Sequence, residues 1–147
     1  MNKSNLIKIL ARYFRNNALK EHVELAFLYG SWAAGRQHKG SDVDIAVLFS
    51  ENAGSEHDIY QSIIDISAEL NDIIDEEINI IQLKRDFDKP MLYYNAAVHG
   101  VPVYFKDEKL YRNYLLEAVS QMEDFCIFGI HWQLVAARHN LKGVINA

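Results

Sequence analysis

The sequence is poor in cysteine, proline and glycine, and each shortage excludes a class of protein. A single cysteine, Cys126, stands in the 147 residues, so no internal disulfide can form and the chain suits a reducing cytoplasm. With 7 glycines and 2 prolines, beside 50% hydrophobic and 24% charged residues, the composition is not that of a collagen, a low-complexity segment or a disordered chain. We therefore expect one globular domain, because a domain usually holds about 100 to 200 residues.

Long apolar runs and an excess of basic charge are also missing. No run approaches the ~18 apolar residues of a membrane-spanning helix, and the polar residues 1–4 lack the apolar run of a secretory signal. Fifteen Lys and Arg against 20 Asp and Glu give a net charge of -5, which disfavours non-specific attraction to a phosphate backbone. These absences predict a soluble cytoplasmic protein that binds neither a membrane nor nucleic acid directly.

The spacing of apolar residues predicts a mixed α/β fold. Steps of three and four, as in Ile59, Ile63 and Ile66, indicate helices, and strict alternation over residues 43–49 indicates a strand. A helix between the second and third strands is typical of a crossover connection. The predicted helices span residues 6–16, 56–73, 88–99 and 107–141, and the predicted strands span residues 23–29, 43–49, 78–83 and 101–105.

The segment between the first two strands holds the residues that point to chemistry. Gly30 and Ser31 end one strand, and Asp42 and Asp44 open the next after ten intervening residues. Side chains alternate along a strand, so both aspartates face one side, with Cα atoms about 6.5 to 7 Å apart. Two such carboxylates suit Mg²⁺, whose shell is completed by substrate phosphates and waters. Gly30 lets a phosphate approach the backbone, and Ser31 offers a hydroxyl where a short helix could begin.

An isolated Asp-x-Asp pair is usually a solvated turn, but the composite pattern resembles a family signature. In the minimal nucleotidyltransferase (MNT) family of the polymerase β superfamily, Gly-Ser and Asp-x-Asp are likewise ten residues apart. The likeness continues through residues 78–83 and 90–104, so it covers about residues 20–106. Within this family the sequence most resembles the MntA-type antitoxins of HEPN/MNT toxin–antitoxin systems.

The resemblance implies a fold, a reaction and a partner. The fold is the α/β (α+β) nucleotidyltransferase fold, a small mixed sheet packed by helices, in one domain of residues 1–147 that ends in a long helix of about residues 107–141. The reaction is transfer of AMP from ATP, with Mg²⁺, to a tyrosine hydroxyl of a HEPN-domain ribonuclease toxin. Asp42 and Asp44 would be catalytic and bind the metal, and Gly30 and Ser31 would bind the nucleotide. Homo- and hetero-oligomers are both left open.

One member of the family pattern is replaced. The family carries a third acidic residue on a later strand, and the best-aligned position here is Asn79, whose amide can offer oxygen to a metal but cannot accept a proton. Glu77, two residues earlier on the same face, could substitute for it. Two interpretations stay open: a transferase, and a catalytically degraded MNT domain that inhibits its toxin by binding alone. A third, adenylation of an antibiotic, needs an acceptor-binding domain for which 147 residues leave hardly any room.

Two further features of the sequence are the cations of the loop and the cysteine. Arg36 and Lys39 lie in the loop before Asp42 and could neutralise triphosphate charge, or could simply be solvated. Cys126 has aromatic neighbours, and we expect it to be a buried small apolar residue.

The C-terminal helix carries two apolar stripes. We expect the first to pack on the sheet and the second to bind a partner, although packing against the first helix could also cover it. The first stripe is Tyr111, Leu115, Ala118, Met122, Phe125 and Trp132; the second is Leu110, Tyr114, Val119, Ile127, Phe128 and Ile130.

Overall fold

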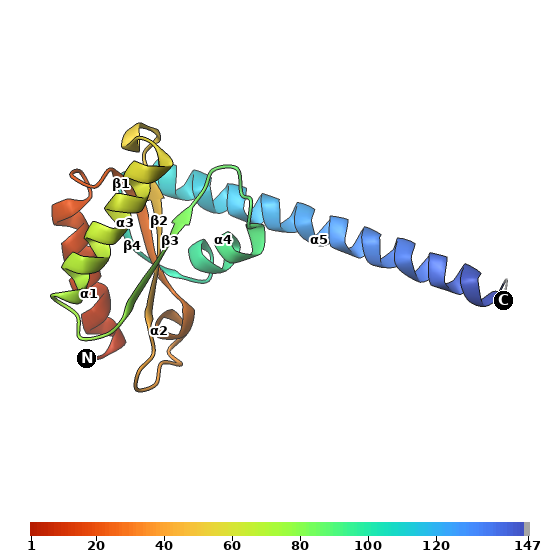
Figure 1. Ribbon diagram of the computed structural model, residues 1–147, viewed down its shortest axis with the longest axis horizontal. Coiled ribbons are helices and arrows are strands. Elements are labelled where there is room, and N and C mark those ends of the chain that lie inside the picture. Colours follow the sequence, from red (N-terminus) through yellow and green to blue (C-terminus); the bar gives the residue numbers. More distant parts are fainter. Residues whose placement is uncertain (146–147) are drawn as a thin grey trace.

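A mixed four-stranded sheet with helices on both faces forms the body of the protein (Figure 1). The structure, a computed structural model, describes residues 1–145. Its elements in chain order are α1 (Lys3–Asn17), β1 (Val23–Tyr29), α2 (Gly30–Ala34), β2 (Val43–Phe49), the 3-10 helix η1 (Glu51–Ala53), α3 (Glu56–Asn71), β3 (Ile78–Leu83), α4 (Pro90–Ala97), β4 (Val101–Phe105) and α5 (Glu108–Ile145). All four strands have the predicted bounds.

The strand order β3-β2-β1-β4 combines antiparallel and parallel pairing. Strand β1 is antiparallel to both β2 and β4, and β2 is parallel to β3. A parallel pair needs a crossover connection, and α3 supplies it as predicted. The mixed α/β architecture expected from the sequence is therefore confirmed.

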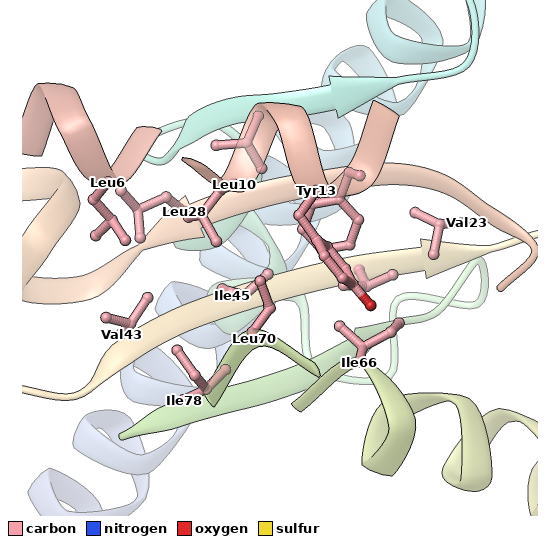
Figure 2. Close-up of a cluster of buried hydrophobic side chains, with 14 of the residues drawn as sticks. Leu6, Leu10, Tyr13, Val23, Leu28, Val43, Ile45, Ile66, Leu70 and Ile78 are labelled. Atoms are coloured by element: carbon pink, nitrogen blue, oxygen red, sulfur yellow. The ribbon is translucent and has the colours of Figure 1, made fainter. Parts of the chain in front are cut away.

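Two apolar layers hold the helices on the sheet. On one face α1 and α3 cover the strands, and Figure 2 shows their side chains gathered around Ile45, with Leu10, Ile66 and Leu70 fully buried. On the other face α4 and the start of α5 pack against the strands through a second buried cluster that includes Tyr93. Tyr29, at the end of β1 where the chemistry is expected, packs against this second cluster.

Helix α4 is shorter than predicted at both ends. It begins at Pro90, because proline suits the first turn of a helix, where no backbone N–H donor is needed. It ends at Ala97, before a turn that only glycine can make. A Cβ atom on Gly100 would collide with the carbonyl oxygens of Ala96 and Leu28. This close approach fixes the end of α4 against β1.

Only the first part of α5 packs on the body. Tyr114 and Ala118 are buried in the second cluster, whereas every residue from 123 to 145 except Gly129 is exposed. Figure 1 shows the reason, since α5 continues far beyond the sheet. No helix within residues 1–145 is long and apolar enough to span a membrane.

This geometry corrects the predicted stripes of the C-terminal helix. Leu110 and Tyr114, expected on the partner stripe, pack in or against the second core cluster. Phe125 and Trp132, expected to pack on the sheet, are 45% and 58% exposed because the sheet ends before they are reached. Cys126 is exposed for the same reason, so the expectation of a buried cysteine was wrong.

Candidate active site

The tightest feature of the site is the contact between Gly30 and Asp44. Strands β1 and β2 are antiparallel with Tyr29 opposite Asp44, so the turn that ends β1 passes directly over the aspartate. A Cβ atom on Gly30 would collide with Asp44 Oδ2, and the φ of Gly30 is +75°, in the left-handed region. The positive φ favours glycine, and a side chain at residue 30 would displace the carboxylate of Asp44. The first residue of the Gly-Ser pair therefore sits against the second carboxylate of the Asp-x-Asp pair.

Hydrogen bonds to Ser41, just before β2, hold the loop between these two motifs in place. The indole N–H of the buried Trp32 donates to the carbonyl oxygen of Ser41 at 3.3 Å. The backbone N–H of His38 donates to Ser41 Oγ at 2.9 Å. These bonds hold the ten-residue loop in one shape, which explains how separated motifs keep a fixed relative position.

Asn79 lies beside Asp44, on the face that the sequence predicts. In the parallel register of β2 and β3 the two residues are partners, and Asn79 Nδ2 donates to Asp44 Oδ1 at 3.1 Å. Asp44 is half-buried and Asn79 is exposed. The amide therefore orients the carboxylate from one side while Gly30 restricts it from the other.

Glu77 lies near Asp42 instead. The backbone N–H of Val43 donates to the carbonyl oxygen of Glu77 at 2.8 Å, and Glu77 and Asp42 line the same open cavity of about 480 Å³. Within residues 1–145, no three His, Cys, Asp or Glu side chains are grouped so that they could hold a metal ion. The described residues thus place an amide beside Asp44 and Glu77 near Asp42, and they hold no cluster of three acids.

This set of ligands fits magnesium. Asp42 is exposed and Asp44 half-buried, so both carboxylates remain open to a ligand. Mg²⁺ commonly uses only one or two protein carboxylates and takes its other oxygen ligands from phosphates and water. The amide oxygen of Asn79 is a further ligand of a suitable type.

A cavity of about 590 Å³ opens beside the Gly30 turn. Tyr29, Gly30, Ser31 and Arg36 are among the residues that line it. The volume falls in the usual range for small-molecule sites, about 300 to 1,000 Å³. Lys39, the other cation of the loop, is exposed and does not line this cavity.

Helix α4 and the turn after it supply a wall that sequence reasoning missed. Leu92 and Asn95, three residues apart on one side of α4, line the same cavity, and His99 lines it from the turn after the helix. The His99 ring packs edge-on against Tyr94, with ring centroids 5.2 Å apart. The only sequence signal was a polar pair, Asn95 and His99, at helical spacing in an otherwise apolar segment.

The environment of Tyr29 keeps its hydroxyl protonated. Burial, and then the negative charge of Asp44, raise the pKa of Tyr29 to about 12. The phenol therefore adds no negative charge beside the aspartates at neutral pH. It borders the cavity as a polar but uncharged group.

Comparison with known proteins gives a family match over most of the body. The family described as polymerase beta, nucleotidyltransferase, matches residues 8–109, which include both motifs and all four strands. Among relatives, the protein adenylyltransferase MntA of Shewanella oneidensis is 30% identical over 84 residues. That match covers 57% of this chain and 52% of the relative, so it spans about half of the relative's length.

Solved structures share the fold along the whole chain. A chain from the crystal structure of a toxin–antitoxin with AMP-PNP matches with a TM-score of 0.57 and 20% identity, covering 100% of both chains. A chain from the structure of a tri-AMPylated Shewanella oneidensis HEPN toxin in complex with an MNT antitoxin matches with a TM-score of 0.54 and 14% identity, covering 96% of this chain and 99% of the other. The likeness establishes the fold and confirms the nucleotidyltransferase fold expected from the motifs.

Proposed function

The chain belongs to the polymerase beta nucleotidyltransferase family, and we propose that it is an antitoxin that transfers AMP from ATP to a tyrosine hydroxyl of a HEPN-domain toxin. The relative named a protein adenylyltransferase and the neighbour bound to an AMPylated HEPN toxin support this reaction. The observation that carries the proposal is the close approach of Gly30 to Asp44, because it places one of the two carboxylates beside the cavity that Gly30 lines.

Each residue of the site has a part in this reaction. Asp42 and Asp44 would hold Mg²⁺, which when bound supplies positive charge to the phosphates it contacts. Gly30 and Ser31 would receive the β- and γ-phosphates in the cavity, and Arg36 would bind phosphate oxygens from its side. The acceptor hydroxyl then attacks the α-phosphorus. The bond from that phosphorus to the oxygen leading to the β-phosphate breaks, and pyrophosphate leaves.

The weak point of the site is removal of the hydroxyl proton. Asn79 cannot accept a proton, and the described residues place no third acid with the pair. The proton would pass to solvent unless Glu77 reaches the acceptor. A general base is typically worth about 10² to 10⁴ in rate, whereas phosphoryl transfer draws most of its acceleration from positioning and electrostatics. We therefore expect slow but measurable transfer.

The second candidate function is inhibition by binding alone. It is favoured by one observation, the hydrogen bond from Asn79 to Asp44, which replaces the interaction a third carboxylate would make with a metal. In that case the chain would silence the toxin without transferring AMP.

One experiment separates the two functions. The chain is incubated with ATP, Mg²⁺ and a HEPN-domain toxin, and intact mass reports each AMP added to that protein. We expect discrete AMP additions that disappear in the double variant Asp42→Asn with Asp44→Asn. The charge-matched control is Asp65→Asn with Asp72→Asn, two exposed residues near the end of α3. Silencing of the toxin by the wild-type chain with no AMP added would establish binding alone.

A further inference from the structure

The exposed end of α5, residues 125–145, is apolar on opposite sides; we name it the α5 arm. Its large apolar residues are between 44% and 76% exposed. Because a helix turns about 100° per residue, two rows with steps of three and four lie on roughly opposite sides. One row is Ile127, Ile130, Leu134, Ala137, Leu141 and Val144, and the other is Phe125, Phe128, Trp132 and Val135.

Such a helix is normally covered by other helices. A helix that is apolar all round lies in an interior, and a regular three-four spacing is the seam by which one helix packs against another. The body of this chain offers no cover, since α5 leads away from it (Figure 1). Two opposite rows need neighbours on both sides, so the matching surface is a cleft between helices and not a single helix.

The charge of the α5 arm specifies its partner further. All 20 acidic residues lie within residues 1–124, together with 13 of the Lys and Arg, which gives that part a net charge of -7. The remaining residues carry only basic charges, Arg138 and Lys142, and two histidines, His131 and His139. A second copy would bring two basic arms together. An acidic rim around the cleft is complementary, and it would also speed association.

A groove connects the α5 arm to the cavity beside Gly30, where we propose that the nucleotide binds. It measures about 540 Å³ and lies where α4 meets α5, with Pro90, Met91 and Leu92 on one side and Phe125 on the other. Phe125 is the first residue of the α5 arm. Leu92 and Asn95 line both this groove and the cavity beside Gly30. The arm, the groove and the cavity are therefore continuous.

We propose that this continuous surface binds the acceptor protein: the α5 arm inserts in an apolar, acid-rimmed cleft of an α-helical partner, and the groove leads the partner's hydroxyl to the α-phosphate. The inference rests on the proposed function for the chemistry at its end, but the docking itself does not need AMP transfer. The two parts of this surface have different roles. The arm supplies affinity, and the groove supplies the position of the acceptor.

The test uses the full-length chain and the HEPN-domain toxin used in the transfer assay, with affinity measured by titration calorimetry. Ile130→Glu with Trp132→Glu changes one residue in each row and is expected to weaken binding about thirtyfold or more, the effect of losing an interface hot spot of about 2 kcal/mol. Leu19→Glu with Tyr60→Glu is the matched control, because both residues are apolar and exposed, at 93% and 62%, on the body. Mg²⁺-ATP affinity is expected to be unchanged in all of these variants.

Two further variants test the charge and the groove. Arg138→Glu with Lys142→Glu is expected to weaken binding about tenfold and to abolish its decrease with added salt. Met91→Ser, at a groove residue that is 49% exposed, is expected to slow AMP transfer about tenfold at saturating partner while binding is retained.

Several outcomes overturn the inference. Unchanged partner affinity in the arm variant removes the α5 arm from the interface. Sedimentation of the chain alone as a dimer that Ile130→Glu dissociates makes the arm a self-association surface. Arm-dependent binding without any AMP transfer by wild type would instead refute the proposed reaction and leave the docking intact.

Discussion

Replacing Asn79 by aspartate should make the stability of the protein depend on bound metal. In wild type, Asn79 Nδ2 donates to Asp44 Oδ1 at 3.1 Å. Asn79→Asp removes this donor, and a hydrogen bond to a charged group is worth about 1.5 to 3 kcal/mol. It also places two negative charges about 3 Å apart, which costs about 1.3 kcal/mol even in bulk water. Without metal we expect the variant to lose about 3 kcal/mol of stability.

The loss is measurable as a shift in melting temperature. For a chain of this size 1 kcal/mol corresponds to about 2 to 4 °C, so the variant should melt roughly 6 to 12 °C lower than wild type in EDTA. Saturating Mg²⁺ should restore most of the difference, because a metal bound between the carboxylates removes their repulsion and binds only the folded state. Wild type should gain much less from Mg²⁺.

The same variant should be the faster enzyme. A carboxylate at residue 79 could accept the proton or bind a metal close to the attacking oxygen, so AMP transfer should rise about ten- to a thousandfold, with Glu77 limiting the gain if it already assists. Asn79→Ala is the control for losing the hydrogen bond without adding charge. Equal melting temperatures of Asn79→Asp and Asn79→Ala in EDTA, or an active wild type that Asn79→Asp does not exceed, would refute this reasoning.

Three other predictions follow from single contacts. Gly30→Ala should lower stability by about 1 to 3 kcal/mol and weaken Mg²⁺-ATP binding, because a Cβ there meets Asp44 Oδ2 at a positive φ; unchanged calorimetric and melting data would contradict it. His99→Ala should weaken ATP binding about tenfold, and the exposed His57→Ala should not, in a direct titration. Tyr13 Oη donates to Glu69 at 2.6 Å, which, with Lys20, lowers the pKa of Glu69. This stabilisation is present above the unfolded pKa and is lost as pH falls through the lowered folded pKa, so Glu69→Gln should destabilise most at pH 7 and progressively less as the pH is lowered in denaturant titrations.

The strands and the central motif could be predicted because they depend on local patterns. Alternation over residues 43–49 and the short β-prone run over residues 78–83 define strands whichever neighbours they acquire, and β-pairing then brings Asn79 beside Asp44. The α4 wall could not be predicted in the same way. Asn95 and His99 belong to the cavity only because the Gly100 turn holds the end of α4 against β1, a contact between segments about 70 residues apart.

The prediction of the two α5 stripes was wrong for a related reason. Periodicity shows which residues share a side of a helix, but it does not show where the neighbouring sheet stops. Ala118 and Phe125 belong to the same predicted stripe, seven residues apart, yet the first is buried and the second is 45% exposed. Sequence composition held one usable signal, the absence of acidic residues after Asp124. This change of charge marks the segment for which we propose a partner, the α5 arm.

Firm docking through the α5 arm can compensate for the rate that is lost with the missing third acid. Without a general base the chemical step loses up to about 10⁴ in rate, but holding two reactants in place can be worth effective concentrations of about 10⁵ to 10⁸ M. A transferase that docks its acceptor firmly can therefore tolerate an amide at residue 79, since each encounter lasts long enough for a slow transfer. A transferase for small, freely diffusing acceptors could not. It follows that Ile130→Glu with Trp132→Glu should reduce AMP transfer at low partner concentration more than Asn79→Ala does. The opposite order would mean that residue 79, and not docking, sets the rate.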